Sequence, residues 1–476
     1  MRYLFKDEFN TQKLNLYLNV STRGFVLLQV NDKRYEKSII EMISSMRITV
    51  AFDLKEADFR EGIEYLRANK EVQVLLYYSL DLHNEKLRNV LEKINLSRDL
   101  LLAQDRIVVF IVPRYVAFMI QDEFPNLYSY FSLKETYIKE YPLFFEYIFP
   151  DKRYLVTKDS QSEFKKFFYA SEEGIEERLD YYMQKKVKEK EVTRLKKDLN
   201  EYLETFHLGT NEYDWRYYYT LLLRMARVCV VQGDYEYAIK MYDQIVTAPI
   251  VLSLYQGIYY EAWLQKADVY FEQKNYKTAI ELYKDVINMV AYRHEYDDQD
   301  VFLEYVVKIC ARLALCDAIV KDYDNANHLM QSALKWAEQR NDEAESFSLI
   351  YNQIILELRA GNTEDVIIGS KFDALKRLIH CELQEALYLS IYAWYRGVIC
   401  GHRRHALKYA YEALALMREN FFENDVRIAE SHYLISILHL LGNETDHAME
   451  CKRKCLNILG NYEFEKERAD AIEKAF

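Results

Sequence analysis

The second half of this chain repeats one short pattern, and a repeat constrains the fold more tightly than composition does. Three segments align without gaps: GDYEYAIKMYDQI (233–245), KNYKTAIELYKDV (274–286) and KDYDNANHLMQSA (321–333). Each has an acidic residue or Asn, then Tyr, and three positions later an Ala: Ala238, Ala279 and Ala326. Another Ala stands twelve positions before each of these: Ala226, Ala267 and Ala314. Small residues at paired positions let two helices approach closely, so the pattern predicts stacked helix pairs.

The pattern resembles the tetratricopeptide repeat, a helix-turn-helix unit. Fainter copies place Ala406 and Ala448 at the turn position, and a weak copy near residue 361 has Val366 there. The resemblance spans residues 213–460. The measurable spacings between turn Ala residues are 41, 47 and 42. The usual repeat has about 34 residues, so longer helices or loops are expected here.

The first half of the chain alternates between short apolar runs and helical patterns. The predicted strands are 25–30, 48–53, 72–78 and 106–112. The predicted helices are 34–46, 55–69, 84–103 and 115–131. Short apolar runs separated by helices are typical of βαβ units around a buried parallel sheet. We therefore expect an α/β N-terminal domain with a P-loop-like layout, followed by an all-α superhelix.

Between these halves the strand pattern fades and charged residues accumulate. Ser171, followed by two Glu, stands where a helix N-cap would, and a charged helical stretch follows it. The predicted division is an α/β domain over 1–137, a helical connector over 138–210 and helical repeats over 211–476. Each flank can bury its own core, so the two halves are expected to be separable.

The segment VNDKRYEKS (30–38) lies between the first predicted strand and helix, where a P-loop would lie. The P-loop motif is G-x-x-x-x-G-K-[ST], and its frame gives Asn31, Glu36, Lys37 and Ser38 here. A Glu in place of the second Gly would fill the phosphate space and repel a polyanion. Asp81 lies past the end of the third strand, where a turn or cap role is favoured over Mg²⁺ binding. We expect a degenerate phosphate loop, no cofactor and no NTP hydrolysis.

Residues 94–132 resemble the later part of the STAND-type NTPase-like domains of bacteria. The shared pattern is an LN-x-x-R helix, an apolar strand ending in Pro, and a segment with a further Pro and Ser. The matching residues are Asn95, Leu96, Arg98, Pro113, Phe124, Pro125, Tyr128 and Ser132. The resemblance covers roughly residues 20–135. It implies an inactive STAND domain before tetratricopeptide repeats, in a bacterial conflict or anti-phage system whose effector is another polypeptide.

Composition excludes several function classes. The net charge of −12 argues against nucleic-acid binding, and the basic stretch 185–197 is interleaved with acids, as in a solvated helix. Seven Cys without a C-x-x-C pair, no apolar leader and no long apolar run favour a cytoplasmic protein without membrane contact. Cys400, His402 and His405 include metal-ligating types, but packing and surface roles are favoured because no second ligand cluster is near.

No G-x-S-x-G, H-E-x-x-H or Cys–His pattern marks a catalytic site. We expect a non-enzymatic regulator or adaptor whose repeats bind a protein or peptide. The first helix of each pair lines the concave surface of such an array. The predicted inward positions are Thr220, Leu223, Arg227, Glu261, Leu264, Asp268, Lys308, Leu315, Tyr388, Tyr395, Glu430 and Tyr433. Aromatic side chains anchor a partner segment, and mixed charges set its register.

Alternatives stay open. The inner face of such long repeats could be filled by its own packing. The protein could be a peptide-sensing regulator of the quorum type, although its α/β N-terminus is unusual for that group. It could also be a weak NTPase that uses Lys37 and Asp81. The sequence does not decide whether the chain forms a homo-oligomer, nor which partner or signal it recognises.

Overall fold

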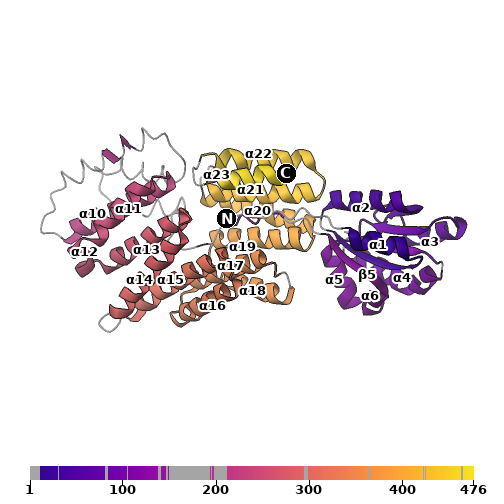
Figure 1. Ribbon diagram of the computed structural model, residues 1–476, viewed down its shortest axis with the longest axis horizontal. Coiled ribbons are helices and arrows are strands. Elements are labelled where there is room, and N and C mark those ends of the chain that lie inside the picture. The colour runs from indigo at the N-terminus through magenta and orange to yellow at the C-terminus, as the bar shows by residue number, and fades with distance from the viewer. Residues whose placement is uncertain are drawn as a thin grey trace.

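The computed structural model describes these residues: 11–30, 32–80, 84–103, 105–137, 141–145, 148, 193–194, 196–197, 212–293, 299–362, 365–421, 423, 425–461 and 465–476. An α/β domain lies at one end of an elongated molecule, and the described residues from 212 onward form helical repeats (Figure 1). The predicted fold class is confirmed.

The α/β domain is built on one parallel five-stranded sheet of order β2-β3-β4-β1-β5. The strands are β1 (Gly24–Val30), β2 (Thr49–Asp53), β3 (Val74–Tyr78), β4 (Ile107–Val112) and β5 (Phe131–Tyr137). The first four match the predicted strands. The fifth was missed, because residues 115–131 were predicted as one helix. As an edge strand, β5 alternates buried and exposed side chains and lacks a continuous apolar run.

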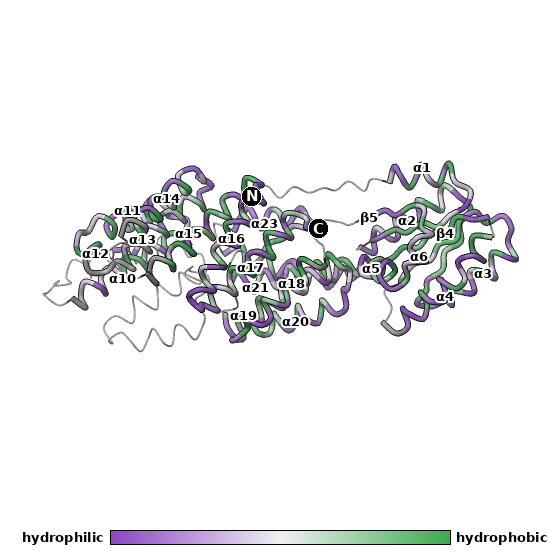
Figure 2. Tube along the Cα trace, turned by 90° about the horizontal axis from the view of Figure 1, so that it is seen from below, coloured by the Kyte–Doolittle hydropathy of each residue, from purple (hydrophilic) through white to green (hydrophobic). Residues whose placement is uncertain are grey.

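Helices cover both faces of the sheet. They are α1 (Gln12–Val20), α2 (Lys33–Met46), α3 (Phe59–Ala68), α4 (Asn84–Leu102), α5 (Arg114–Glu123) and α6 (Pro125–Tyr130). Side chains of α1 and α2 pack on one face of the sheet, and those of α3 to α6 pack on the other. Figure 2 shows the hydrophobic strand β4 between more hydrophilic helices. After β1 the chain crosses to the far edge, and after β4 it crosses to the other side of β1. The carboxyl ends of β1 and β4 therefore form the topological switch point, where α/β sheets usually bind ligands.

The residues of the STAND-like pattern have structural roles in this domain. The Arg98 guanidinium donates to the Asn95 side chain at 2.6 Å and lies over the Tyr130 ring. Pro125 opens α6, where its missing N–H costs nothing. The Ser132 hydroxyl donates to the Phe25 carbonyl at 3.0 Å, which ties β5 to β1. The pattern therefore fixes the last helix–helix–strand unit against the sheet.

Among the described residues from 212 onward, six helix pairs follow, each packed as a hairpin. They are α10 (Glu212–Val231) with α11 (Tyr235–Val246), α13 (Gln256–Glu272) with α14 (Tyr276–Arg293), α15 (Gln299–Ile319) with α16 (Tyr323–Gln339), α17 (Glu343–Ala360) with α18 (Asp365–Arg377), α19 (Glu382–Trp394) with α20 (Arg403–Asn420), and α21 (Val426–Leu441) with α22 (Thr445–Leu459). A short helix α12 (Pro249–Leu254) precedes α13. A short π-helix η2 (Tyr395–Ile399) continues from the end of α19, and α23 (Lys466–Ala475) follows the last pair.

Local sequence explains these hairpins. Ala226 and Ala238 are both fully buried where α10 and α11 meet, as the repeat pattern predicts. Gly233 takes a left-handed conformation (φ +81°) in the turn. Asp234 then caps α11, accepting a hydrogen bond from the Tyr237 N–H at 3.2 Å. The next two hairpins repeat this arrangement: Lys274 and Lys321 have positive φ, and Asn275 and Asp322 cap the helices that follow.

The predicted helical connector is wrong for part of its length. Residues 141–145 and 148 are not helical. Their apolar side chains are buried among the last three helix pairs, which no exposed connector helix would allow. Residues 193–194 and 196–197 are helical, and the remainder of 138–210, including Ser171 and most of the basic stretch, lies outside the described residues.

Candidate partner-binding groove

The inner face of the repeats is formed by the first helix of each pair. Ten of the twelve predicted residues there belong to α10, α13, α15 and α21, while Tyr388 belongs to α19 and Tyr395 to η2. Their surroundings divide the face into two halves. Paired charges run across α10, α13 and α15 to the first turn of α17, and we call this part the polar half. Aromatic side chains dominate the rest of α17 together with α19 and α21, which we call the aromatic half.

A row of alternating charges crosses the polar half. The row consists of Arg227, Glu261, Lys308, Glu304, Arg340 and Glu345. Successive nitrogen–oxygen distances along it are 3.1, 4.0, 2.6, 3.8 and 2.9 Å. Each charge in this polar row therefore lies within 4.0 Å of an opposite charge of the same row.

Glu345 ends the polar row in a buried position at the start of α17. Burial raises its pKa to about 7, and the nearby Asp342 carboxylate acts in the same direction. Arg340 opposes this shift from 2.9 Å. Burial has the larger effect on the pKa, because the carboxylate loses more free energy of hydration than it gains from its attraction to the Arg340 guanidinium.

Seven of the twelve predicted inward residues are buried, which corrects that part of the prediction; four of them lie in the first three helix pairs and three, Tyr388, Tyr395 and Tyr433, in the last two. Leu223, Leu264 and Leu315 are buried among apolar side chains. Asp268 is buried as well, with its Oδ1 2.9 Å from the Arg312 Nε and 2.6 Å from the Tyr283 hydroxyl. Helix periodicity places all four on the inward side. Packing between neighbouring repeats, which that periodicity does not describe, then covers them.

The aromatic half already holds a segment of the same chain without regular secondary structure, which we call the strap (residues 141–145 and 148). Asn352 of α17 is fully buried and pairs with the strap backbone at Ile148. Its Oδ1 accepts the Ile148 N–H at 2.8 Å, and its Nδ2 donates to the Ile148 carbonyl at 3.0 Å. Arg359, on the same helix, donates to the Phe145 carbonyl at 3.1 Å. Both residues bind backbone N–H and C=O groups, which are present in a peptide of any sequence.

Aromatic side chains hold the strap from the other two helices. The Tyr433 hydroxyl of α21 donates to the Pro142 carbonyl at 2.9 Å, and its ring meets Phe144 edge-on at 4.6 Å between centroids. Phe145 meets Trp394 of α19 edge-on at 5.8 Å. The strap therefore crosses α21, α19 and α17 in that order. Of the predicted residues, Tyr433 is the one that these contacts join to the strap.

The remaining predicted residues contact their own array. The rings of Tyr388 and Tyr395 both pack against Phe372 of α18. Glu430 pairs with Arg468 of α23 at 2.9 Å. The Thr220 hydroxyl donates to the Arg216 carbonyl within α10.

The predicted phosphate loop takes a different form. Helix α2 begins at Lys33, so Glu36, Lys37 and Ser38 belong to the helix and not to a loop. Lys37 is largely exposed on that helix, 3.9 Å from Glu41. Only two residues separate the end of β1 from the start of α2. Asn31 and Asp81 lie outside the described residues.

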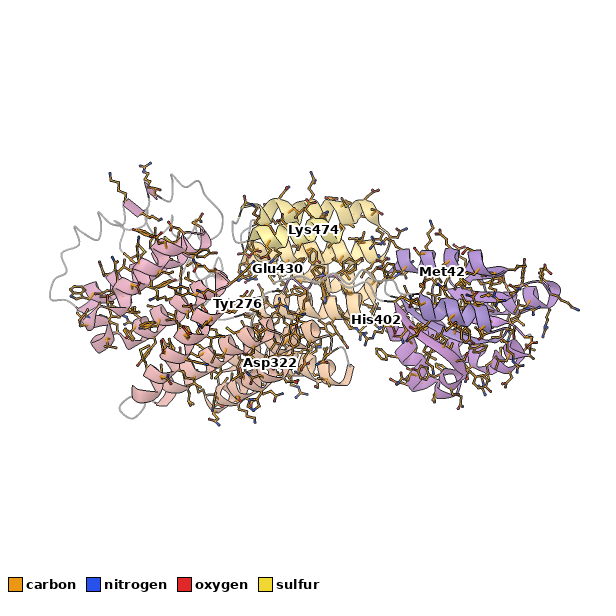
Figure 3. The ribbon with its side chains drawn as sticks, in the orientation of Figure 1. Met42, Tyr276, Asp322, His402, Glu430 and Lys474 are labelled. Atoms are coloured by element: carbon orange, nitrogen blue, oxygen red, sulfur yellow. The ribbon has the colours of Figure 1, made fainter. Side chains whose placement is uncertain are left out.

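The switch point of the sheet instead receives the repeats and the strap. Asp32 is buried there and caps α2, with its carboxylate 2.6 Å from the Arg34 guanidinium and 3.0 Å from the Tyr141 hydroxyl. Tyr115, just after β4, stacks on His402 at 3.6 Å between centroids and donates its backbone N–H to Cys400. Figure 3 shows His402 where the repeats meet the α/β domain. The edge at which such sheets bind ligands is thus an internal interface.

His402 owes its environment to this interface. Burial lowers its pKa to about 3, and the charges of Arg396 and His405 act in the same direction. Its neighbour Gly401 has φ +83°, and a Cβ there would stand 3.0 Å from Pro113. Among the described residues no three His, Cys, Asp or Glu side chains are grouped as metal ligands, Cys400, His402 and His405 included.

Residues 260–289 match the family model for the tetratricopeptide repeat. That stretch covers most of α13 and α14 and includes the turn residue Ala279. The match covers one helix pair. The other helix pairs among the described residues share its hairpin packing, so the helical part is tetratricopeptide-like. No curated protein matches the sequence significantly.

Similar solved structures include a STAND protein with a tetratricopeptide repeat sensor from Pyrococcus horikoshii, which is 13% identical over 98% of this chain and 86% of that one, with a TM-score of 0.38. The apo quorum sensor NprR from B. thuringiensis is 14% identical over 64% of this chain and 81% of its own, with a TM-score of 0.38. A Rap protein complexed with competence and sporulation factor is 14% identical over 63% and 75%, with a TM-score of 0.41. Scores this low carry no argument about function.

The strap and Asn352 were missed from the sequence. One signal was present, since YPLFFEYIF is strongly apolar and follows the α/β domain directly. A charged, exposed connector would not begin in this way.

No helix in the described part of the chain is both long and apolar enough to cross a lipid bilayer.

Proposed function

We propose that this protein is a non-enzymatic regulator that binds an extended segment of a partner protein or peptide along the inner face of its repeats. The observation that supports this proposal most directly is the strap. The inner face already holds a segment of the same chain through Asn352, Arg359 and Tyr433. A surface that satisfies the backbone of one segment has the donors and acceptors to satisfy another.

The two halves of the face have different tasks in this proposal. Rings such as Trp394 and Tyr433 contribute affinity, because burying large aromatic side chains yields most of the energy at peptide interfaces. The polar row contributes selectivity. A partner that places a charge against Arg227 or Glu261 must replace an existing pair, so a mismatched charge is penalised.

Cross-linking in the native host tests this proposal. A photoreactive residue at Thr220 faces the inner surface, and the same residue at Lys240, on the outer helix α11, is the matched control. We expect one partner to be captured from Thr220 and not from Lys240. Capture from Lys240 alone would place the partner on the outer surface and refute the proposal.

Charge reversals then test the polar row. Arg227→Glu and Lys308→Glu should each reduce recovery of that partner, while circular dichroism shows unchanged helical content. Asp268→Lys is unsuitable for this purpose, because it would place a second cation beside the buried Arg312. Unchanged recovery with both variants would remove the polar row from the proposal.

We also propose that the chain does not hydrolyse nucleotides. The support is that Lys37 lies on an exposed helix surface and that Arg34 and Tyr141 contact Asp32 at the switch point. Calorimetry with millimolar Mg-ATP and Mg-GTP should show no saturable binding, with and without Lys37→Ala. Saturable binding that Lys37→Ala abolishes would support the NTPase alternative instead.

The wider setting that we propose is a bacterial anti-phage system whose effector is a separate polypeptide. The STAND-like pattern over residues 94–132 is its support. Deleting the gene in the native host should lower phage resistance, and re-expression should restore it. Unaltered resistance, together with a thermal shift by short secreted peptides, would favour a quorum-type sensor.

A further inference from the structure

We infer that the aromatic half of the groove accepts a partner segment with two adjacent large aromatic or apolar side chains, which competes with the strap and thereby loosens the α/β domain. This inference rests on the proposed function and names its partner class. The strap shows what the site selects, because its own residues fill it. Phe144 and Phe145 are adjacent, nearly fully buried, and packed against different helices.

The groove also requires an occupant. Asn352 is fully buried, and its side-chain amide bonds the Ile148 backbone through both its oxygen and its nitrogen. If the strap left and nothing replaced it, this buried amide would lose those partners, which is unfavourable. Exposed rings of Trp394 and Tyr433 would add to the penalty. The strap is therefore expected to leave by exchange with another segment, and not by simple dissociation.

The strap connects this site with the sheet. Its first residue, Tyr141, donates to the Asp32 carboxylate at 3.0 Å and accepts from Arg34 at 2.6 Å. Asp32 caps α2 at the switch point. A segment that displaces Phe144 and Phe145 pulls directly on Tyr141, three residues away along the chain. Binding of a segment in the groove and ordering of the first turn of α2 are therefore coupled equilibria, so each changes the free energy of the other.

Competition with a tethered segment sets the affinity of the partner. A tethered segment acts at an effective concentration on the order of millimolar. A free segment with identical contacts therefore binds the intact protein weakly. A segment with better contacts, or a chain whose strap is weakened, should show much tighter binding.

The experiment uses the full-length chain and a labelled peptide of sequence YPLFFEYI with a charged solubilising tail. Binding is followed by fluorescence anisotropy. Strap variant Phe144→Ala/Phe145→Ala should bind the peptide at least about tenfold more tightly than the unmodified protein, the equivalent of roughly 1.4 kcal/mol. A peptide in which both Phe are replaced by Ala is the matched control and should not bind.

Groove variants should act in the opposite direction. Added to the strap variant, Asn352→Ala or the milder Arg359→Gln should weaken peptide binding at least about tenfold. General misfolding would change both classes of variant in the same direction, so opposite signs identify competition. Equal affinity of the strap variant and the unmodified protein overturns the inference, and so does binding that both groove variants leave unchanged.

Hydrogen exchange tests the connection with the α/β domain. Peptide binding should increase exchange in the first turn of α2, and Tyr141→Phe should increase it without peptide. Unchanged exchange in both cases overturns the coupling. If no variant binds the peptide while Thr220 still captures a partner, this inference fails and the proposed function stands. If Thr220 captures nothing but the peptide competes with the strap, the proposed function fails alone.

Discussion

Buried charges in the first repeats stabilise the array and are not available to a partner. Arg312 is almost fully buried, and its guanidinium lies 2.9 Å from the Asp268 carboxylate. Tyr283 donates to the same carboxylate at 2.6 Å. The three side chains come from α15, α13 and α14, so they join two successive repeats.

Single and double substitutions of Arg312 and Asp268 should change the free energy of unfolding as expected for a buried ion pair. Arg312→Met leaves the Asp268 charge unpaired in the core and should cost about 3–5 kcal/mol, while Asp268→Leu/Arg312→Met should be much closer to neutral. Urea unfolding measures both. Arg227→Met, at a more exposed pair, is the control and should cost about 0–1 kcal/mol. Equal costs for Arg312→Met and Arg227→Met would contradict this account.

Glu345 should make stability depend on pH in an unusual direction. Its pKa is raised from 4.5 to about 7, so between these values the folded state holds a proton that the unfolded state has lost. The contribution of Glu345 to stability is therefore greatest below pH 4.5 and falls as pH rises through 7, by up to about 3 kcal/mol. Glu345→Gln should remove this part of the dependence and be the more stable protein at pH 8. Parallel urea-unfolding profiles across pH 5–8 would show that the shift is absent.

At the scale of elements, the start of α5 meets the turn between η2 and α20. The Tyr115 ring stacks on His402, and the Tyr115 N–H donates to Cys400 at 2.9 Å. The pKa of His402 is lowered to about 3 from 6.5, so the folded state keeps the imidazole neutral. The unfolded state takes up a proton as pH falls below 6.5, and the stability contributed by this contact declines from there toward pH 3.

This contact should therefore be sensitive to acid. His402→Phe keeps the aromatic stack but carries no titrating group, and it should lose less stability between pH 7.5 and pH 4.5 than the unmodified protein. His402→Ala should lose the stack at both values. Thermal unfolding at the two pH values, compared variant by variant, measures this. An identical acid loss in His402→Phe would assign the sensitivity to other groups.

At the scale of the whole molecule, the chain crosses its own array. The strap buries aromatic side chains among helices more than 200 residues later. The array also curves so that Lys274, at the turn of the second pair, pairs with Glu467 of α23. Residues distant in sequence therefore hold the last three pairs together, which limits how separable the two halves are.

Two fragments test how far the strap supports the repeats. A fragment starting at residue 205 lacks the strap, and one starting at 138 retains it. Each fully buried apolar side chain contributes about 1.5–3 kcal/mol, so the shorter fragment should melt roughly 5–10 °C lower. Adding the YPLFFEYI peptide should restore part of that loss. Equal melting temperatures would mean that the repeats form without the strap.

Local patterns were enough to predict much of this protein. The Ala pairs and the capping residues Asp234, Asn275 and Asp322 lie within a few turns of one another, so the sequence alone predicted the first three hairpins. The last three gave only fainter copies of the pattern. The continuous apolar runs of β1, β3 and β4 predicted these central strands, because a buried parallel strand must be apolar on both faces. The edge strand β2 was found because its sequence TVAFD is still mostly apolar. The other edge strand, β5, has the sequence FSLKETY and was missed because it lacks such a run.

The groove and its occupant were decided by tertiary structure. The contacts that define them join residues 204, 214 and 291 positions apart, namely Ile148 with Asn352, Phe145 with Arg359, and Pro142 with Tyr433. No local period records which of two inward-facing side chains will be covered by a neighbouring repeat, as Leu264 is, and which will meet a strap, as Tyr433 does. That distinction depends on where the superhelix brings distant segments together, and the free energy of burial that selects it exists only once the array has formed.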